Sequence, residues 1–148
     1  MTIAYQEFYT ADDYSLWEGE WELIGGMPYA MSPSPSVTHQ SLCTNLATSL
    51  KNSLDTQTNI KQCGDCIVLM GTDWQISNDT AVRPDVMIVC QALQEKVLVT
   101  PSLIIEVVSK SSTKRDEVMK FELYQQEGVL YYILVYPDKR LAAFSNTK

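Results

Sequence analysis

The sequence predicts an α/β fold in which a mixed β-sheet is covered by helices on both faces. Three continuous apolar runs predict the central strands, at residues 86–89, 103–108 (interrupted only by Glu106) and 131–135. Runs without polar alternation are typical of strands that are buried on both faces. A helical segment from about Thr113 to Gln126, ended by Gly128, separates the second run from the third. Such a strand–helix–strand unit normally forms a parallel pair with a right-handed crossover.

The segments before these runs predict a short helix, a hairpin and two further strands. Thr10 can cap the short helix, because a threonine side chain accepts a hydrogen bond from the first helical turn. Residues 21–24 and 27–31 flank Gly25-Gly26, a pair that tolerates the positive φ angles of a tight hairpin turn. Residues 66–76 suggest two strands around Gly71, and residues 77–80 read as a polar loop.

A long helix is predicted between the hairpin and these strands. Pro33 and Pro35 cannot continue a strand, and Ser36 can cap a helix that runs to about Leu54. One face carries its apolar positions together with the single histidine: His39, Leu42, Cys43, Leu46, Leu50 and Leu54. This face should pack on the core, so His39 should point inward near the start of the helix.

The composition of the 148 residues indicates one domain over residues 1–148, with 45% hydrophobic content. No apolar run is long enough to span a membrane, and the N-terminus lacks the pattern of a signal peptide, so a cytoplasmic location is expected. Without a secretory signal, the four cysteines are expected to be free thiols. Cys63 and Cys66 have the spacing of half a zinc site, but no second pair exists, and zinc is not expected there.

The charge balance limits the kinds of nucleic-acid contact that can be expected. A net charge of −7 argues against tight, nonspecific binding, which depends on neutralising phosphates with Lys and Arg. One local basic cluster is present, formed by Lys110, Lys114, Arg115 and Lys120. Any contact with nucleic acid should therefore use this local patch.

Two acidic residues stand where the core is expected. Glu106 interrupts an apolar strand, where an unpaired carboxylate would cost several kcal/mol. Asp85 stands between Pro84 and the start of another central strand. Two carboxylates on neighbouring buried strands suit Mg²⁺, which prefers oxygen ligands. The alternative is that Asp85 caps a turn and Glu106 pairs with a lysine.

The order of motifs along the chain is that of a known family. The motifs are Glu22-Leu23-Ile24-Gly25-Gly26, Met31-Ser32-Pro33-Ser34-Pro35, His39, Pro84-Asp85, Glu106-Val107-Val108-Ser109, Asp116, Lys120, Tyr124, Gly128 and Pro137-Asp138. Over nearly its whole length the chain resembles the bacterial "putative restriction endonuclease" (Uma-type) domains of the PD-(D/E)XK nuclease superfamily. The resemblance implies a restriction-endonuclease-like fold. Because relatives tend to continue past the strand that ends near Phe144, the C-terminal edge of the domain is left open.

The lysine of the superfamily motif is missing from its usual place. It normally stands two residues after the glutamate, where this chain has Val108. The resemblance points instead to Lys120 on the following helix, where apolar neighbours predict that it lies against the sheet. The alternative is that the Lys120 stem covers apolar surface while its ammonium pairs with Asp116.

The resemblance implies metal-dependent hydrolysis of phosphodiester bonds, with DNA as the expected substrate. Asp85, Glu106 and the carbonyl of Val107 would hold Mg²⁺ or Mn²⁺, and Lys120 would orient or deprotonate the attacking water. Glu22 could contact the metal through water, or be a solvent-facing acid. His39 could orient a phosphate or a metal-bound water, or be an ordinary core residue. Asp116 would support Lys120 and Arg115 would contact phosphate, unless both are solvated helix charges.

Other functions remain open at this point. The acidic net charge favours a nuclease fold that has lost activity and serves as a binding or interaction module. A phosphatase or nucleotide hydrolase could use the same carboxylates, although no glycine-rich phosphate loop is present. Assembly into a homodimer is also left open.

Overall fold

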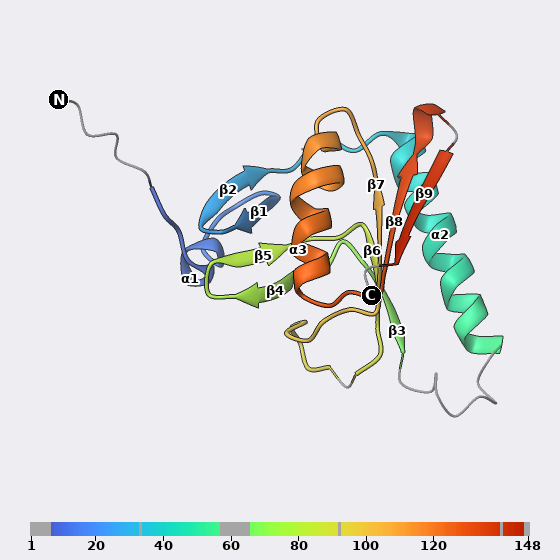
Figure 1. Cartoon of the computed structure of the whole chain (residues 1–148), viewed down its shortest axis with the longest axis horizontal. Coiled ribbons are helices and arrows are strands. Elements are labelled where there is room, and N and C mark those ends of the chain that lie inside the picture. The colour runs from blue at the N-terminus through green and yellow to red at the C-terminus, as the bar shows by residue number, and fades with distance from the viewer. Residues whose placement is uncertain (1–6, 33, 57–65, 92, 140, 147–148) are drawn as a thin grey trace.

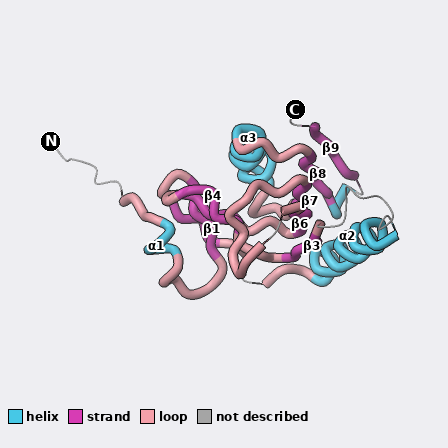
Figure 2. Tube along the Cα trace, turned by 90° about the horizontal axis from the view of Figure 1, so that it is seen from below, coloured by secondary structure: helices cyan, strands magenta, loops and turns pink. Residues whose placement is uncertain are grey.

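The computed structural model describes residues 7–32, 34–56, 66–91, 93–139 and 141–146. Its larger sheet has five strands in the order β3-β6-β7-β8-β9. These strands are β3 (Ile67–Met70), β6 (Val86–Val89), β7 (Leu103–Val107), β8 (Tyr131–Tyr136) and β9 (Leu141–Asn146). Helix α2 (Val37–Thr56) lies on one face of this sheet and α3 (Lys120–Gln126) on the other (Figures 1 and 2).

The pairing of the central strands confirms the mixed sheet. β7 runs parallel to β8, with Glu106 opposite Leu134, while β6 runs antiparallel to β7. All four residues of β6 are buried, and so are four of the five in β7. The first two apolar runs therefore correspond to strands that are covered on both faces. The expectation is wrong for β8, in which Tyr132 and Leu134 are buried but Tyr131 is exposed and Ile133 half-buried.

A second sheet, which the sequence did not predict, stands beside α3 (Figure 1). Its order is β2-β1-β5-β4, from β1 (Trp21–Ile24), β2 (Met27–Ala30), β4 (Trp74–Ser77) and β5 (Thr80–Val82). The predicted hairpin is present, and Gly25 and Gly26 adopt φ angles of 58° and 79° in its turn. β5 was missed because it is short and begins in a stretch read as a polar loop.

The helices begin where the capping residues predict. Thr10 forms a capping box with Asp13 at the start of α1 (Ala11–Tyr14). Ser36 Oγ accepts a hydrogen bond of 3.0 Å from the backbone N–H of His39 at the start of α2. Within the part of the chain that the structure describes, no helix is long and apolar enough to cross a membrane.

Two apolar clusters fix the helices to the sheet. Cys43 and Ala47 of α2 pack with Val86, Ile105 and Val107 on one face. On the other face Tyr124 of α3 packs with a set of buried residues that reaches across both sheets and includes Trp74, Met87, Ile104 and Tyr132. Successive residues of β7 therefore face opposite helices, as the pleat of a strand requires.

The expectation that the cysteines are free thiols is wrong for two of them. Cys66 and Cys90 form a disulfide. Cys66 precedes Ile67, and Cys90 follows Val89. Because Ile67 and Val89 are paired in the antiparallel strands β3 and β6, the register places the two cysteines opposite each other. The prediction rested on the expected compartment and took no account of this register. Cys43 is free and buried, and Cys63 lies outside the described residues.

Candidate active site

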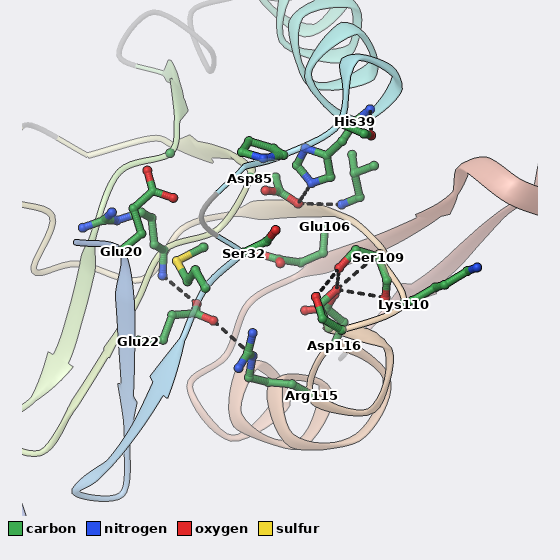
Figure 3. Close-up of a pocket in the computed structure, with 18 of the residues that line it drawn as sticks. Glu20, Glu22, Ser32, His39, Asp85, Glu106, Ser109, Lys110, Arg115 and Asp116 are labelled. Atoms are coloured by element: carbon green, nitrogen blue, oxygen red, sulfur yellow. Dashed lines mark hydrogen bonds and ion pairs between the residues drawn. The ribbon is translucent and has the colours of Figure 1, made fainter.

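A pocket of about 450 Å³ lies where the small sheet, the start of α2 and the segment before α3 meet the ends of β6 and β7 (Figure 3). All seven side chains that the sequence singled out line it: Glu22, His39, Asp85, Glu106, Arg115, Asp116 and Lys120. Val107 lines it as well. The fold therefore brings the predicted residues to one place, although they form two separate contact networks.

Strand alternation decides which way Glu106 faces. Ile105 and Val107 belong to the cluster under α2, while Ile104 and Val108 belong to the cluster under α3. Glu106 must therefore point to the α3 side, where Lys120 lies. Its carboxylate is buried, and one of its oxygens, Oε1, has no hydrogen-bond partner.

Lys120 is the centre of the first network. Its ammonium lies 2.7 Å from Glu22 Oε2, 3.1 Å from Glu106 Oε2 and 3.7 Å from Asp116 Oδ1. The residue is only 1% exposed, so it does not reach into solvent. The side chain from the crossover helix thus lies beside the carboxylate of β7, as the sequence predicted, and it also pairs with Asp116.

A π-helical turn positions this lysine. The helix predicted from Thr113 begins with a wide turn, η1 (Arg115–Met119), in which the Lys120 N–H donates to the Arg115 carbonyl five residues earlier. The hydroxyl of Tyr132 on β8 donates to the Asp116 carbonyl at 2.8 Å, which satisfies a carbonyl of this turn. Isolated π-turns of this kind are frequent at functional sites.

Glu22 belongs to the site itself. It is 1% exposed, so the alternative of a solvent-facing acid on the hairpin is wrong. Besides Lys120, its Oε2 accepts a 2.8 Å hydrogen bond from the backbone N–H of Arg83. The residue is buried because Lys120 and Arg115 cover the face of β1 to which its side chain points.

Asp116 and Arg115 are not solvated helix charges. Asp116 is buried, and neither of its carboxylate oxygens has a hydrogen-bond partner. Arg115 Nε lies 3.4 Å from Glu22 Oε1, and its guanidinium stacks over the ring of Tyr29 at 5.5 Å. Arg115 is thus held by the small sheet, and its side chain, 14% exposed, still reaches the pocket wall.

Asp85 belongs to the second network, with residues of α2. Its Oδ2 accepts a 2.7 Å hydrogen bond from the Val107 N–H and lies 3.4 Å from His39 Nε2. The other ring nitrogen of His39 lies 3.7 Å from the sulfur of Cys43. Hydrogen bonds to Asp85 first, and then to Cys43, raise the pKa of His39 to about 11. Both ring nitrogens of His39 thus face polar side chains at the pocket.

The first network holds more acids than bases. Three carboxyl groups (Glu22, Glu106 and Asp116) face two cations (Lys120 and Arg115), so the network has one negative charge in excess when all three acids are ionised. Burial raises the pKa of Glu106 well above its usual value, and it also raises that of Asp116. Burial alone would lower the pKa of Lys120, but the carboxylates of Glu106, Glu22 and Asp116 raise it well above its usual value. The surrounding carboxylates therefore favour the charged form of Lys120.

The residues present fit a divalent cation beside Asp85 and Glu106. Glu106 Oε1 is buried without a hydrogen-bond partner, and the side-chain contacts of Asp85 with Val107 and His39 use Oδ2. Unsatisfied carboxylate oxygens in a region with excess negative charge suit a hard cation such as Mg²⁺. Among the described residues, the only cluster of three side chains with metal-binding atoms mutually within 4.8 Å is a different one, His39, Cys43 and Asp85.

Three residues that lie near the site were not singled out from the sequence. Cys43 stands four residues after His39, a spacing that puts both on one helix face and could have drawn attention to the pair. Tyr29 packs on Arg115, and Arg83 lines the pocket while its Nε pairs with Asp73 Oδ1 at 2.7 Å. No local pattern identifies the latter two, because their partners lie on other elements.

Comparisons with known proteins agree with the predicted resemblance. The chain matches, over residues 8–144, the model of the family "Uma2: Putative restriction endonuclease". It is similar in structure to "a putative nuclease belonging to DUF820 from Anabaena variabilis ATCC 29413", with a TM-score of 0.74 and 13% identity over 94% of this chain and 80% of that chain. No curated protein matches. The second likeness shows the fold, and the first shows that this chain belongs to the Uma2 family of "Putative restriction endonuclease" proteins.

Proposed function

We propose that this chain hydrolyses phosphodiester bonds in DNA as a Mg²⁺-dependent or Mn²⁺-dependent endonuclease, with Asp85, Glu106 and Lys120 at its centre. One observation carries the proposal. The ammonium of Lys120, which comes from the crossover helix, lies 3.1 Å from Glu106 Oε2 in the pocket that Asp85 also lines. The three residue types of a PD-(D/E)XK centre are thus present although position 108 is valine.

Asp85 and Glu106 would hold the metal. The Val107 N–H and His39 fix one oxygen of Asp85, which leaves Oδ1 for the pocket. Glu106 contributes Oε1, and the backbone carbonyl of Val107 is the third ligand that the resemblance implies. A bound Mg²⁺ or Mn²⁺ would polarise the phosphate and make a bound water more acidic.

Lys120 acts in this proposal as a fixed positive charge and hydrogen-bond donor. Its contacts with Glu22 and Asp116 hold the ammonium in place before substrate arrives. A preorganised donor of this kind stabilises the negative charge that develops on phosphate oxygens. Because the surrounding carboxylates favour the charged form, we assign it to orienting water and phosphate and not to removing a proton.

The substrate would approach along the cationic wall of the pocket. Lys110 and Arg115 line it, whereas Lys114 does not, so the basic cluster of the sequence is divided. Two surface cations suit a local contact with a few phosphates, in keeping with a net charge of −7. A single domain over residues 1–148, a cytoplasmic location and a homodimer remain predictions.

Cleavage of supercoiled plasmid DNA tests the proposal. Wild type with Mg²⁺ or Mn²⁺ should nick or linearise the plasmid, and a chelator should stop the reaction. Asp85→Asn and Glu106→Gln preserve side-chain size and should each lower the rate by about a hundredfold or more. Glu122→Gln is the matched control, because Glu122 is exposed on α3, and it should cleave like wild type.

A second candidate function is a binding module without turnover. The observation that favours it is the complete burial of Lys120 among three carboxylates, which leaves little of its charge for a substrate. DNA that binds to wild type and to Glu106→Gln with similar affinity, but is cleaved by neither, would favour this function over the nuclease.

A further inference from the structure

We propose that His39, Cys43 and Asp85 form a second metal site, one that takes a borderline-soft divalent ion of the Zn²⁺ type. The site lies on the α2 side of the sheet and shares Asp85 with the carboxylate pair described above. Its existence does not depend on nuclease activity. Its proposed effect, competition with Mg²⁺ for Asp85, rests on the proposed function.

The geometry brings three ligand atoms together from two elements. His39 and Cys43 stand four residues apart on α2, and Asp85 stands directly before β6 (Figure 3 shows His39 and Asp85). One ligand atom from each residue lies within 4.8 Å of the other two. Two contacts are closer, with Cys43 Sγ 3.7 Å from His39 Nδ1 and Asp85 Oδ2 3.4 Å from His39 Nε2.

These separations are close to what a tetrahedral ion requires. Zinc binds nitrogen at about 2.0 Å and sulfur at about 2.3 Å, so its ligands lie about 3.3–3.8 Å from one another. Because the two close contacts use different ring nitrogens, a rotation of the imidazole must aim one nitrogen at the ion. His39 lies at the pocket wall, where such a rotation is not blocked by complete burial.

The charges and ligand types favour zinc over magnesium. A thiolate and a carboxylate supply two negative charges, which match a divalent ion. Binding releases two protons to solvent, one from the Cys43 thiol and one from the pair formed by His39 and Asp85. Sulfur and imidazole ligands select Zn²⁺ and similar ions, whereas Mg²⁺ prefers oxygen ligands and water. The two metal sites should therefore differ in the ion that they bind.

The pocket gives access to this site from one side. His39 and Asp85 line the pocket, while Cys43 is 3% exposed and closes the inner side among Ala47, Val86 and Val107. Three protein ligands leave a fourth position, which water from the pocket can fill. An ion held there engages Asp85, so it should weaken Mg²⁺ binding and inhibit cleavage.

Titration with Co²⁺ tests the site directly, because Co²⁺ replaces Zn²⁺ and a bound thiolate gives a charge-transfer band in the near ultraviolet. Cys63, which lies outside the described residues, is replaced by Ser in every sample so that Cys43 is the only free thiol left. The sample is kept oxidised so that the Cys66–Cys90 disulfide stays intact. We expect the band in this background, and also in Glu106→Gln, which lacks the carboxylate of the other site.

Two variants decide the assignment. Cys43→Ser should remove the band, and His39→Gln should weaken Co²⁺ binding by about tenfold or more. His39 is at the pocket wall, so His39→Gln gives a readout even if Cys43→Ser does not fold, which thermal melting would show. Absence of the band in the starting protein, or an unchanged band and affinity in a folded variant, overturns the proposal.

A second measurement tests whether Zn²⁺ competes with Mg²⁺ for Asp85. With Mg²⁺ present, micromolar Zn²⁺ should inhibit plasmid cleavage by wild type, and Cys43→Ser, which leaves Asp85 and its hydrogen bonds in place, should need about tenfold more Zn²⁺ for the same inhibition. Equal inhibition of both proteins contradicts the competition. If no protein cleaves DNA, the nuclease proposal fails, while the Co²⁺ band still decides whether the second site exists.

Discussion

The two faces of strand β7 bury different kinds of side chain. On the α2 face, Ile105 and Val107 pack with apolar residues, and their burial is itself favourable. On the α3 face, Glu106 is buried among other acids with too few cations, and it keeps an oxygen without a partner. Burying an uncompensated carboxylate costs several kcal/mol. The comparison teaches that the α2 face is stabilised by apolar burial, while the α3 face keeps a buried carboxyl group, that of Glu106, whose charge requires a proton or a cation.

The largest effect on stability is expected from removing the central cation of the charged face. Lys120→Ala should lower the free energy of unfolding by about 3–5 kcal/mol, because it leaves Glu22, Glu106 and Asp116 without their main counterion. Urea denaturation measures this loss. Lys51→Ala is the control, since Lys51 is exposed on α2, and it should change stability by no more than about 0.5 kcal/mol. A loss below about 1 kcal/mol for Lys120→Ala would mean that the charges are not coupled as described.

A slightly smaller loss is expected on the apolar face. Ile105→Ala should cost about 3 kcal/mol, through lost burial and the cavity that remains under α2. Val118→Ala provides a matched control, because Val118 is 52% exposed and its truncation opens no cavity. Mg²⁺ should not restore the stability of Ile105→Ala beyond the increment that it gives to wild type. Full rescue by the metal would show that the two faces are not separate in the way proposed.

A smaller effect on stability is expected from two buried tyrosines on the α3 face, which differ in whether the hydroxyl group is hydrogen-bonded. The Tyr132 hydroxyl donates to the Asp116 carbonyl at 2.8 Å, whereas the Tyr124 hydroxyl has no hydrogen-bond partner among the described residues. Tyr132→Phe should therefore cost about 1 kcal/mol, and Tyr124→Phe about zero. Thermal melting of the two variants side by side measures the difference. The reverse order would contradict the role given to Tyr132 in holding the π-turn.

Local sequence patterns predicted the larger sheet and the centre of the site. β6, β7 and β8 are apolar runs of strand length, and a charged residue within such a run, Glu106, is visible without a structure. Lys120 was chosen because the resemblance points to the helix after β7, and its apolar neighbours on that predicted helix indicated that it faces the core. Burial of Glu22 could not be predicted, since it depends on Arg115 and Lys120, which are far along the chain.

The remaining features depend on contacts between distant elements. The disulfide of Cys66 with Cys90 follows from the register of β3 and β6, which no local pattern fixes. The π-turn before α3 lies where a tyrosine from β8 reaches the Asp116 carbonyl. The second sheet needs a strand of three residues to be recognised within polar surroundings. In each case the decisive partner is remote in sequence.

Calorimetric titration of Mg²⁺ tests most directly whether the excess negative charge of the α3 face serves a metal. Wild type should bind the ion, Glu106→Gln should bind it at least about tenfold more weakly, and Glu122→Gln, which changes an exposed acid on α3, should match wild type. The reason is that Glu106 offers a buried carboxylate oxygen without a hydrogen-bond partner in the pocket that Asp85 also lines. Equal affinity of wild type and Glu106→Gln would contradict the metal site and, with it, the proposed nuclease centre.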